Sequence, residues 1–347
     1  MKLELSRVVQ GRSRLGVLKR LGRAGQHSLE VPGCLLYTHL GTVPHLTQDT
    51  LHTLSNLPSV TQVTLSNIAE HQEVLEEFKD GFRKFSGLHD TVLYCSLHDP
   101  ATPCPTGYTT NKELEGVEVF GAVEGGDILE ERVRSARETA KRPVAGFCLD
   151  GLQTGSMDQA LRTQLITAVT KELPEDKPRL LQGVGRPDEV LECVDAGVDL
   201  FESFFPFQVT ERGCALCFSF DVSPDPERAV LELDGEKEMA GETQQNGDLN
   251  LDDQTQMTSF EINLKDKRYQ GDFRPLVEGC GCYCCKNHQR AYLHHLLVTN
   301  ELLAGVLLMI HNTAHYHGFF SALREALAND KLDLLKRRVL RERDGQT

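Results

Sequence analysis

Between residues 117 and 204 the chain alternates short apolar runs with amphipathic stretches, and this order restricts the possible folds more than any other feature. Such an alternation is typical of parallel strands joined by crossover helices, so it predicts an α/β fold. A proline at 187 and a glycine at 197 mark the two ends of the last helix. The predicted strands are 117–123, 144–149, 180–184 and 198–204, and the predicted helices are 128–139, 157–173 and 188–195.

Carboxylate and glycine residues stand where these predicted strands end. They include Glu124, Asp150, Gly183 and Glu202. In α/β barrels and open α/β sheets, ligands bind at the carboxyl ends of the strands. We therefore expect a ligand site there, although a glycine after a strand can also serve only to permit a tight turn.

The flanking sequence predicts further elements of the same kind. Residues 67–85 are expected to form one helix whose apolar face, carrying Leu75, Phe78, Phe82 and Phe85, packs into the core. We assign no chemistry to that helix. Further strands are predicted at 35–37, 62–65, 91–96, 215–221 and 259–264, and the last two are expected to pair with each other.

Composition indicates a globular protein of a reducing compartment. The 347 residues, 39% hydrophobic and 25% charged, suffice for a barrel of about 250 residues with an added subdomain. No apolar block of a signal peptide appears in residues 1–23, and the longest apolar stretch, 296–310, is too short to span a bilayer. Eleven cysteines in such a chain favour metal binding over disulfides, with the cytosol as the expected location.

The charge of the chain is unevenly distributed. The net charge of −14 disfavours binding of polyanions by the surface as a whole, so contact with nucleic acid requires a local basic patch or a partner's surface. Residues 222–257 are strongly acidic and poor in large apolar groups, which predicts a disordered loop. The tail, 331–347, is basic and is expected to be a solvated, frayed helix or a phosphate contact.

A cluster of cysteines near residue 280 predicts a zinc site. Zinc prefers four soft or borderline ligands in a tetrahedron, and this run places several thiolates within one turn. Adjacent Cys284 and Cys285 should point apart, which leaves Cys280, Cys282 and Cys285 as the natural set. The alternative is a group of reduced thiols without a metal.

The fourth ligand is expected to be one of several nearby histidines. If residues 289–316 are helical, His311 continues the apolar stripe of Leu303 and Leu307 and faces inward. His315, one turn further along, is the second candidate. The remaining histidines of this region, expected to be bystanders, are His288, His294, His295 and His317.

A second cysteine pair, Cys214 and Cys217, has the spacing of half a zinc site. It lacks a matching second half, and it begins a predicted strand, where side chains at odd spacing point to opposite faces. We therefore expect ordinary packing of these two thiols.

Several motifs around the zinc site and the last strands match those of a known family. They are Cys280-Gly-Cys282-Tyr-Cys284-Cys285, Arg290-Ala-Tyr-Leu-His-His-Leu296, Glu301-Leu-Leu303, His311-Asn312, Gly183-Val-Gly-Arg-Pro-Asp188 and Gly197-Val-Asp-Leu-Phe201. In these motifs the chain resembles the tRNA-guanine transglycosylases.

This resemblance implies a fold and an activity. It implies a TIM-barrel-like fold, here either closed or incomplete, with an inserted zinc-binding subdomain, and one Zn²⁺ per subunit held by Cys280, Cys282, Cys285 and His311. It implies exchange of guanine 34 of tRNA for queuine. It also implies a dimer formed near the zinc region, and a location in the cytoplasm and at the outer face of mitochondria.

The chain departs from the family pattern at the reaction site. The nucleophilic aspartate falls at Glu202, whose extra methylene disturbs an in-line attack, and the base-reading glutamine falls at Glu124. Phe207 and Gln208 replace a Thr-Arg pair, and the general-base aspartate motif is not found. The sequence between Asn111 and Val117 is also much shorter than in the family.

These departures predict a non-catalytic family member that pairs with a catalytic homologue, with a homodimer also possible, and that helps to hold tRNA. One alternative is an active base-exchange enzyme with Glu202 as nucleophile, and another is a metabolic barrel enzyme with a small-molecule substrate. The basic residues that could touch tRNA are Lys265, Lys267, Arg268, Lys286 and Arg290.

Four regions follow from these assignments. Residues 1–221 are expected to form the N-terminal region and the barrel strands, and 222–257 the acidic loop. Residues 258–330 are expected to form the zinc-binding subdomain with the closing helices, followed by the basic tail at 331–347.

Overall fold

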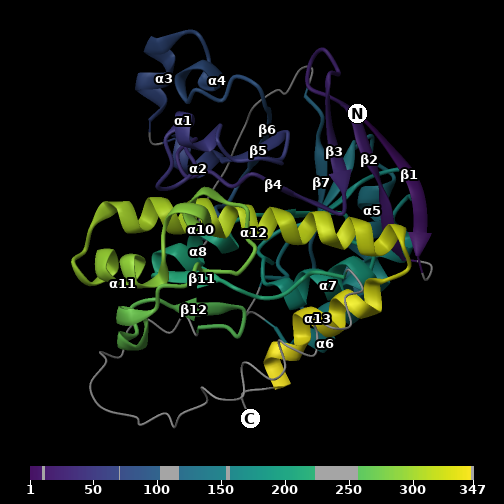
Figure 1. The fold of residues 1–347 in the computed structure, drawn as a ribbon. Coiled ribbons are helices and arrows are strands. Elements are labelled where there is room, and N and C mark those ends of the chain that lie inside the picture. The colour runs from purple at the N-terminus through teal and green to yellow at the C-terminus, as the bar shows by residue number, and fades with distance from the viewer. Residues whose placement is uncertain (10–11, 70, 102–116, 154–156, 223–256, 345–347) are drawn as a thin grey trace.

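A parallel sheet forms the centre of the molecule (Figure 1). The computed structural model describes residues 1–9, 12–69, 71–101, 117–153, 157–222 and 257–344. Five parallel strands follow the order β4-β10-β9-β8-β7, so the α/β class is confirmed. The strands are β4 (Gly33–Leu35), β7 (Phe120–Val123), β8 (Gly146–Leu149), β9 (Arg179–Leu181) and β10 (Leu200–Glu202).

The alternation predicted for residues 117–204 is confirmed, because three helices connect β7, β8, β9 and β10 in turn. Every residue of β8, β9 and β10 is buried, as expected for parallel strands that are covered on both faces. The connecting helices are α5 (Leu129–Ala140), α6 (Gln159–Glu172) and α7 (Pro187–Asp195).

A second parallel pair, β5 (Val60–Thr64) and β6 (Val92–Ser96), continues the sheet beyond β4. The link is a parallel bridge between Leu36 and Thr61. In the extended order β6 and β7 are the two outermost strands. The ring of Tyr94 in β6 nevertheless lies 5.9 Å from the ring of Phe120 in β7. The outermost strands thus approach each other through side chains, and no backbone ladder joins them among the described residues.

Three antiparallel strands that the sequence did not predict pack against the sheet. They are β1 (Lys2–Val9), β2 (Ser13–Leu21) and β3 (His27–Val31). Apolar residues from all three share a core with Leu180 and Leu200 of the parallel strands. A buried ion pair between Arg14 and Asp199 fastens β2 to the sheet, since the Asp199 carboxylate also accepts a bond from the backbone N–H of Arg179.

The prediction of one helix at 67–85 is wrong. This stretch forms α2 (Leu65–Ala69), α3 (Gln72–Phe78) and α4 (Phe82–Phe85), with left-handed backbone at Lys79 and Gly81 ending α3. Phe78 and Phe85 form an edge-to-face pair, their centroids 5.4 Å apart, and are 41% and 45% exposed rather than packed in the core. The apolar spacing was right for a helix, but the break at Lys79 turns these side chains toward solvent.

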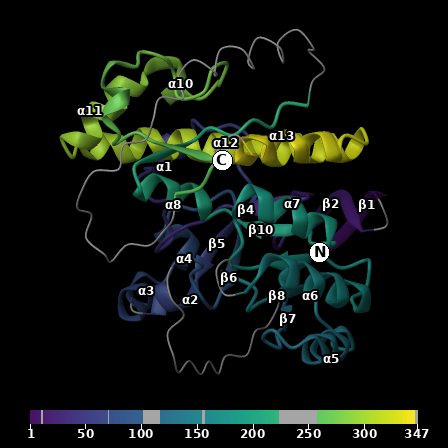
Figure 2. The ribbon, with the colours of Figure 1, turned by 90° about the horizontal axis from the view of Figure 1, so that it is seen from below.

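The C-terminal third builds a smaller unit around one long helix. The predicted strand pair is confirmed as antiparallel β11 (Cys214–Leu216) and β12 (Glu261–Asn263). Figures 1 and 2 show α12 (Leu302–Ala328) running across the whole molecule, with α10 and α11 near its first turns. The other elements are α1 (Gln48–Leu51), α8 (Phe205–Glu211), η1 (Lys267–Gly271), α10 (Tyr283–Asn287), α11 (Arg290–Val298) and α13 (Leu332–Asp344).

The tail at 331–347 differs from the solvated helix expected. Leu332, Leu335 and Val339 of α13 are buried in the main core, because this face of the helix packs on α7. The expected acidic loop at 222–257 lies outside the described residues except at its two ends. Among the helices that are described, none combines the length and apolar character needed to cross a membrane.

The buried pair of Arg14 and Asp199 gives a first test of this fold. Replacing Asp199→Ala leaves a buried guanidinium unpaired, so we expect the free energy of unfolding to fall by about 3–5 kcal/mol. Urea denaturation measures this change. The control is Glu138→Ala in α5, which removes the exposed pair with Lys141 and should change stability very little; equal losses would contradict the role given to Asp199.

Candidate metal centre and strand-end pocket

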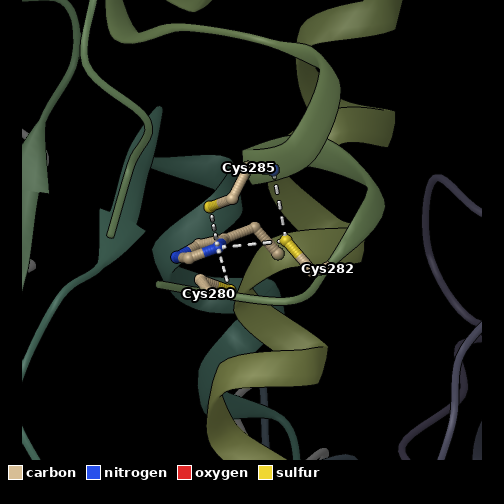
Figure 3. Close-up of side chains that lie close together, drawn as sticks. Cys280, Cys282 and Cys285 are labelled. Atoms are coloured by element: carbon tan, nitrogen blue, oxygen red, sulfur yellow. Dashed lines mark hydrogen bonds between the residues drawn. The ribbon is translucent and has the colours of Figure 1, made fainter. Parts of the chain in front are cut away.

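The structure brings together the side chains of Cys280, Cys282, Cys285 and His311 (Figure 3). Their ligand atoms all lie within 4.8 Å of one another. The Nδ1 atom of His311 is 3.9 Å from the sulfur of Cys280, 3.5 Å from that of Cys282 and 3.3 Å from that of Cys285. Three sulfurs and one imidazole nitrogen at these distances could hold a metal ion.

The surrounding backbone orients this cluster. His311 is fully buried on α12, and its Nε2 donates to the carbonyl oxygen of Leu216 at 2.8 Å, so its Nδ1 lone pair faces the cysteines. Cys282 caps the N-terminus of α10, where the backbone N–H of Cys285 donates to its sulfur at 3.4 Å. A bond of this kind favours the thiolate, the form of cysteine that binds metals.

The other candidates lie outside the cluster. Cys284 is buried in an apolar core, and burial raises its pKa well above the ordinary thiol value. His315 is bound through Nε2 to the carbonyl oxygen of Phe218 at 3.0 Å, and burial lowers its pKa to about 3. Of the second cysteine pair, Cys214 is buried in β11, as ordinary packing requires.

A second feature is a cavity of about 610 Å³ at the carboxyl ends of the parallel strands. The residues expected there from the sequence line it together: Glu124 after β7, Asp150 after β8, Gly183 after β9 and Glu202 at the end of β10. Asp99, which follows β6, adds a further carboxylate. The lining is therefore strongly acidic.

Glu202 is fully buried, and both of its oxygens accept hydrogen bonds. One bond comes from Gln62 Nε2 in β5 at 2.5 Å and the other from the backbone N–H of Gly183 at 2.8 Å. Burial raises the pKa of Glu202 to about 8 against the opposing effect of these two bonds, and the nearby carboxylates of Asp150 and Asp99 add to the rise. At neutral pH this side chain is mostly a neutral acid.

Asp99 was not among the residues expected at this site from the sequence. Its buried carboxylate accepts bonds from the Tyr37 hydroxyl at 3.0 Å and from Asn67 Nδ2 at 2.9 Å, and it lies 3.3 Å from Nδ1 of His39. The signal that could have found it is the one that found Glu124, because Asp99 also lies shortly after a predicted strand, 91–96.

Arg132 is a buried cation in the wall of the cavity. Its guanidinium donates to the carbonyl oxygens of Val123 and Gly126 after β7 and of Asp150 and Gly151 after β8. These bonds fix the two loops that carry the acidic side chains.

Comparison with known proteins gives a consistent result. A family model described as "Queuine tRNA-ribosyltransferase" matches residues 104–345. The chain is 56% identical to the "Queuine tRNA-ribosyltransferase accessory subunit 2" of Danio rerio, with 99% of this chain and 100% of that protein covered. It is 49% identical to the protein of that name from Homo sapiens (99% and 100% covered) and 31% identical to that from Ixodes scapularis (90% and 94%).

The lengths of these matches also carry information. The alignment with the Danio rerio protein spans 421 positions, whereas this chain has 347 residues. That relative therefore contains segments that this chain lacks, in keeping with the shortened sequence noted between Asn111 and Val117, which lies outside the described residues.

The cysteine cluster gives a second test. Replacing Cys285→Ser removes a soft ligand, so we expect the purified protein to lose its bound metal, measured by mass spectrometry of the metal content, and to melt at a lower temperature. Cys284→Ser is the matched control, because this neighbouring sulfur lies outside the cluster. Equal metal content in the two variants would refute the ligand set.

Glu202 gives a third test, through pH. The folded protein holds its proton up to about pH 8, whereas the carboxyl of an unfolded chain titrates near 4.5, so this group reduces stability progressively as pH rises between those values. Glu202→Gln stays neutral, and urea denaturation should show it gaining about 1 kcal/mol or more on the wild type between pH 5 and pH 8. Glu124→Gln, on the exposed rim of the cavity, is the control. A constant difference for Glu202→Gln would contradict the assigned proton.

Proposed function

The chain belongs to the queuine tRNA-ribosyltransferase family, and we propose that it is the non-catalytic subunit of a tRNA-guanine transglycosylase, acting with a catalytic homologue to exchange guanine 34 of tRNA for queuine. The observation that carries this proposal is the state of Glu202, the position that corresponds to the family's nucleophile. A nucleophilic carboxylate needs a free, ionised oxygen directed at the ribose. Glu202 has both oxygens hydrogen-bonded and keeps its proton at neutral pH.

The lining of the cavity supports the same proposal. Glu124 stands where the family reads the base with a glutamine, so a side chain that both donates and accepts is replaced by one that, when ionised, only accepts. Phe207, at a further changed position, stacks on Tyr37 with ring centroids 5.8 Å apart and takes part in packing. We propose that a TIM-barrel-like scaffold persists here without a working reaction site.

We assign Zn²⁺, one per subunit, to the cysteine cluster. In a tetrahedral zinc site with Zn–S near 2.3 Å and Zn–N near 2.05 Å, sulfur and nitrogen ligands lie about 3.6 Å apart. The three distances to His311 Nδ1, 3.3 to 3.9 Å, bracket that value. Zinc in such a closed site has a structural role: it holds α10 against α12.

The partner is proposed to dock on the surface near this cluster. Monomeric proteins rarely expose large contiguous apolar patches, yet Val298 is 64% exposed and Leu302 90% exposed at the junction of α11 and α12. We call these exposed apolar side chains the α11–α12 rim. Its members are Phe273, Tyr283, Tyr292, Val298, Leu302 and Leu303.

Contact with tRNA is proposed to use exposed lysines of the same C-terminal unit. Arg290 is committed to Asp272 and to backbone carbonyls, and Arg268 pairs with Asp266, so these two serve the fold first. The exposed ammonium groups of Lys265, Lys267 and Lys286 remain for phosphates. We place the complex in the cytoplasm and peripherally on the mitochondrial outer membrane.

Assembly is the first experiment on this proposal. Mixing the chain with the catalytic homologue should give a one-to-one complex in light scattering after size exclusion, and Leu302→Asp should weaken it by about tenfold or more, since a charge enters the apolar contact. Val8→Asp, at an exposed apolar residue of β1, is the control. Two outcomes count against the rim: homodimers alone, or an unchanged complex with Leu302→Asp.

Activity separates the non-catalytic proposal from its alternative, an enzyme that uses Glu202. The purified chain alone should not exchange labelled guanine into tRNA, and the complex should do so at a rate that Glu202→Ala leaves unchanged. Exchange by the chain alone that Glu202→Ala abolishes would overturn the proposal.

A further inference from the structure

The parallel strands curl around one core but leave an opening between two of them. Within the described residues, seven parallel strands follow the order β6-β5-β4-β10-β9-β8-β7. All seven contribute side chains to one apolar cluster, which includes Val60, Tyr94, Phe120 and Leu200. A closed α/β barrel has eight parallel strands, so this wall is one strand short of closing.

The place for an eighth strand lies between β6 and β7, in sequence as well as in space. β6 ends at Ser96 and β7 begins at Phe120, and the described part of the chain has no strand between them. The alignment with the Danio rerio relative is longer than this chain, in keeping with a segment of the wall that this chain lacks. We call the opening between these two strands the β6–β7 seam.

The strands on either side of the seam are less covered than the rest of the sheet. Cys95 of β6 and Ala122 of β7 are exposed, whereas every residue of β8, β9 and β10 is buried. Leu97, directly after β6, and Val119, directly before β7, are 53% and 44% exposed. Parallel strands are normally buried on both faces, so the seam lacks a cover that such strands usually have.

The backbone of β6 offers hydrogen-bonding groups to the seam. The N–H of Val92 donates to the carbonyl oxygen of Ser59 at 2.9 Å, on the side of β5. Successive residues of a strand turn their N–H and C=O groups to opposite sides, so those of Leu93 and Cys95 point away from β5. Over the described ranges of the chain, β6 pairs with β5 alone, so these groups have no ladder partner.

The backbone of β7 offers the same groups from the opposite edge. The carbonyl oxygen of Val123 accepts from the N–H of Asp150 at 3.3 Å, on the side of β8. The N–H and C=O groups of Phe120 and Ala122, at odd spacing from Val123, therefore point away from β8. The two edges run parallel to each other, and one extended strand between them could pair with both.

The side chains around the seam define what can fill it. β6 and β7 have the sequences VLYCS and FGAV, without charge or proline, although exposed sheet edges usually carry such residues to prevent pairing. An inserted strand turns alternate side chains toward the apolar core. Those side chains must therefore be uncharged, and the segment must have no proline in its middle, because its N–H groups are needed for pairing.

We propose that the β6–β7 seam binds one extended, proline-free segment of another protein, which adds a parallel strand to the sheet through its backbone. Apolar side chains at alternate positions of that segment face the core. The inference rests on the geometry of the sheet and does not depend on the proposed role in tRNA modification.

The test uses the full chain and synthetic peptides of about ten residues, long enough for one strand, that together cover the part of the Danio rerio relative aligned between β6 and β7. One peptide should bind in calorimetry, and hydrogen exchange should show the amides of Cys95 and Ala122 protected by it. The same peptide with a central proline lacks a ladder donor and should bind about tenfold more weakly. No binding by any peptide, or binding without protection of these amides, would overturn the proposal.

Two variants of one residue make the test specific. Cys95→Pro removes an N–H that points into the seam and leaves the bonds from β6 to β5, so the peptide should bind about tenfold more weakly. Cys95→Ala keeps this N–H and is the matched control. Equal binding by the two variants would contradict pairing through the backbone, and the proline peptide keeps the test valid if Cys95→Pro does not fold. Dimers of the chain alone that Cys95→Pro abolishes would mean that a second copy fills the seam, and the proposed partner would be wrong.

Discussion

The hydrogen bond from His311 to the carbonyl oxygen of Leu216 joins the two halves of this molecule. It holds the imidazole toward three sulfurs, and it satisfies the backbone of β11, the strand that leads away from the parallel sheet. The neighbouring Asn312 accepts from the Leu216 N–H and donates to the carbonyl oxygen of Cys214 and to Thr210. Two adjacent side chains of α12 therefore fix β11, α8 and the cysteine turn relative to one another.

Glu202 ties neighbouring parallel strands together at the edge of the acidic cavity. Its carboxyl group stands on β10 and binds the side chain of Gln62 on β5 and the backbone that follows β9. Three strands are thereby tied together at the edge where relatives of this fold usually bind ligands. A group committed to such bonds holds the edge in place, which supports the non-catalytic role proposed above.

Local sequence patterns were sufficient to predict the parallel strands between 117 and 204 and the position of His311 on its helix. The apolar runs between 117 and 204 are bounded by charged and glycine residues, so their identity as strands did not depend on distant contacts. The same holds for His311, since its spacing from Leu307 fixes the face of α12 on which it lies. The periodicity of apolar residues therefore predicted that Leu307 and His311 are both buried, as the structure shows.

Features that depend on contacts between distant segments could not be predicted from the sequence. The strands β1 to β3 are held by contacts such as Arg14 with Asp199, 185 residues apart. Phe78 and Phe85 have core-like spacing, but the backbone at Lys79 takes a conformation that no pattern of apolar residues signals.

The helix α12 contributes to three apolar clusters at once, through Phe319 and Leu323, through Leu307 and Leu308, and through Met309 and Ile310. A continuous helix of 27 residues cannot easily lose one part while keeping another, because helix formation is cooperative. An ion that binds only the folded state adds a free energy that grows with the logarithm of its free concentration. If the cysteine cluster binds the proposed ion, that contribution extends through α12 to the parallel sheet, and the cellular supply of the ion would help to set how much of the chain escapes proteolysis.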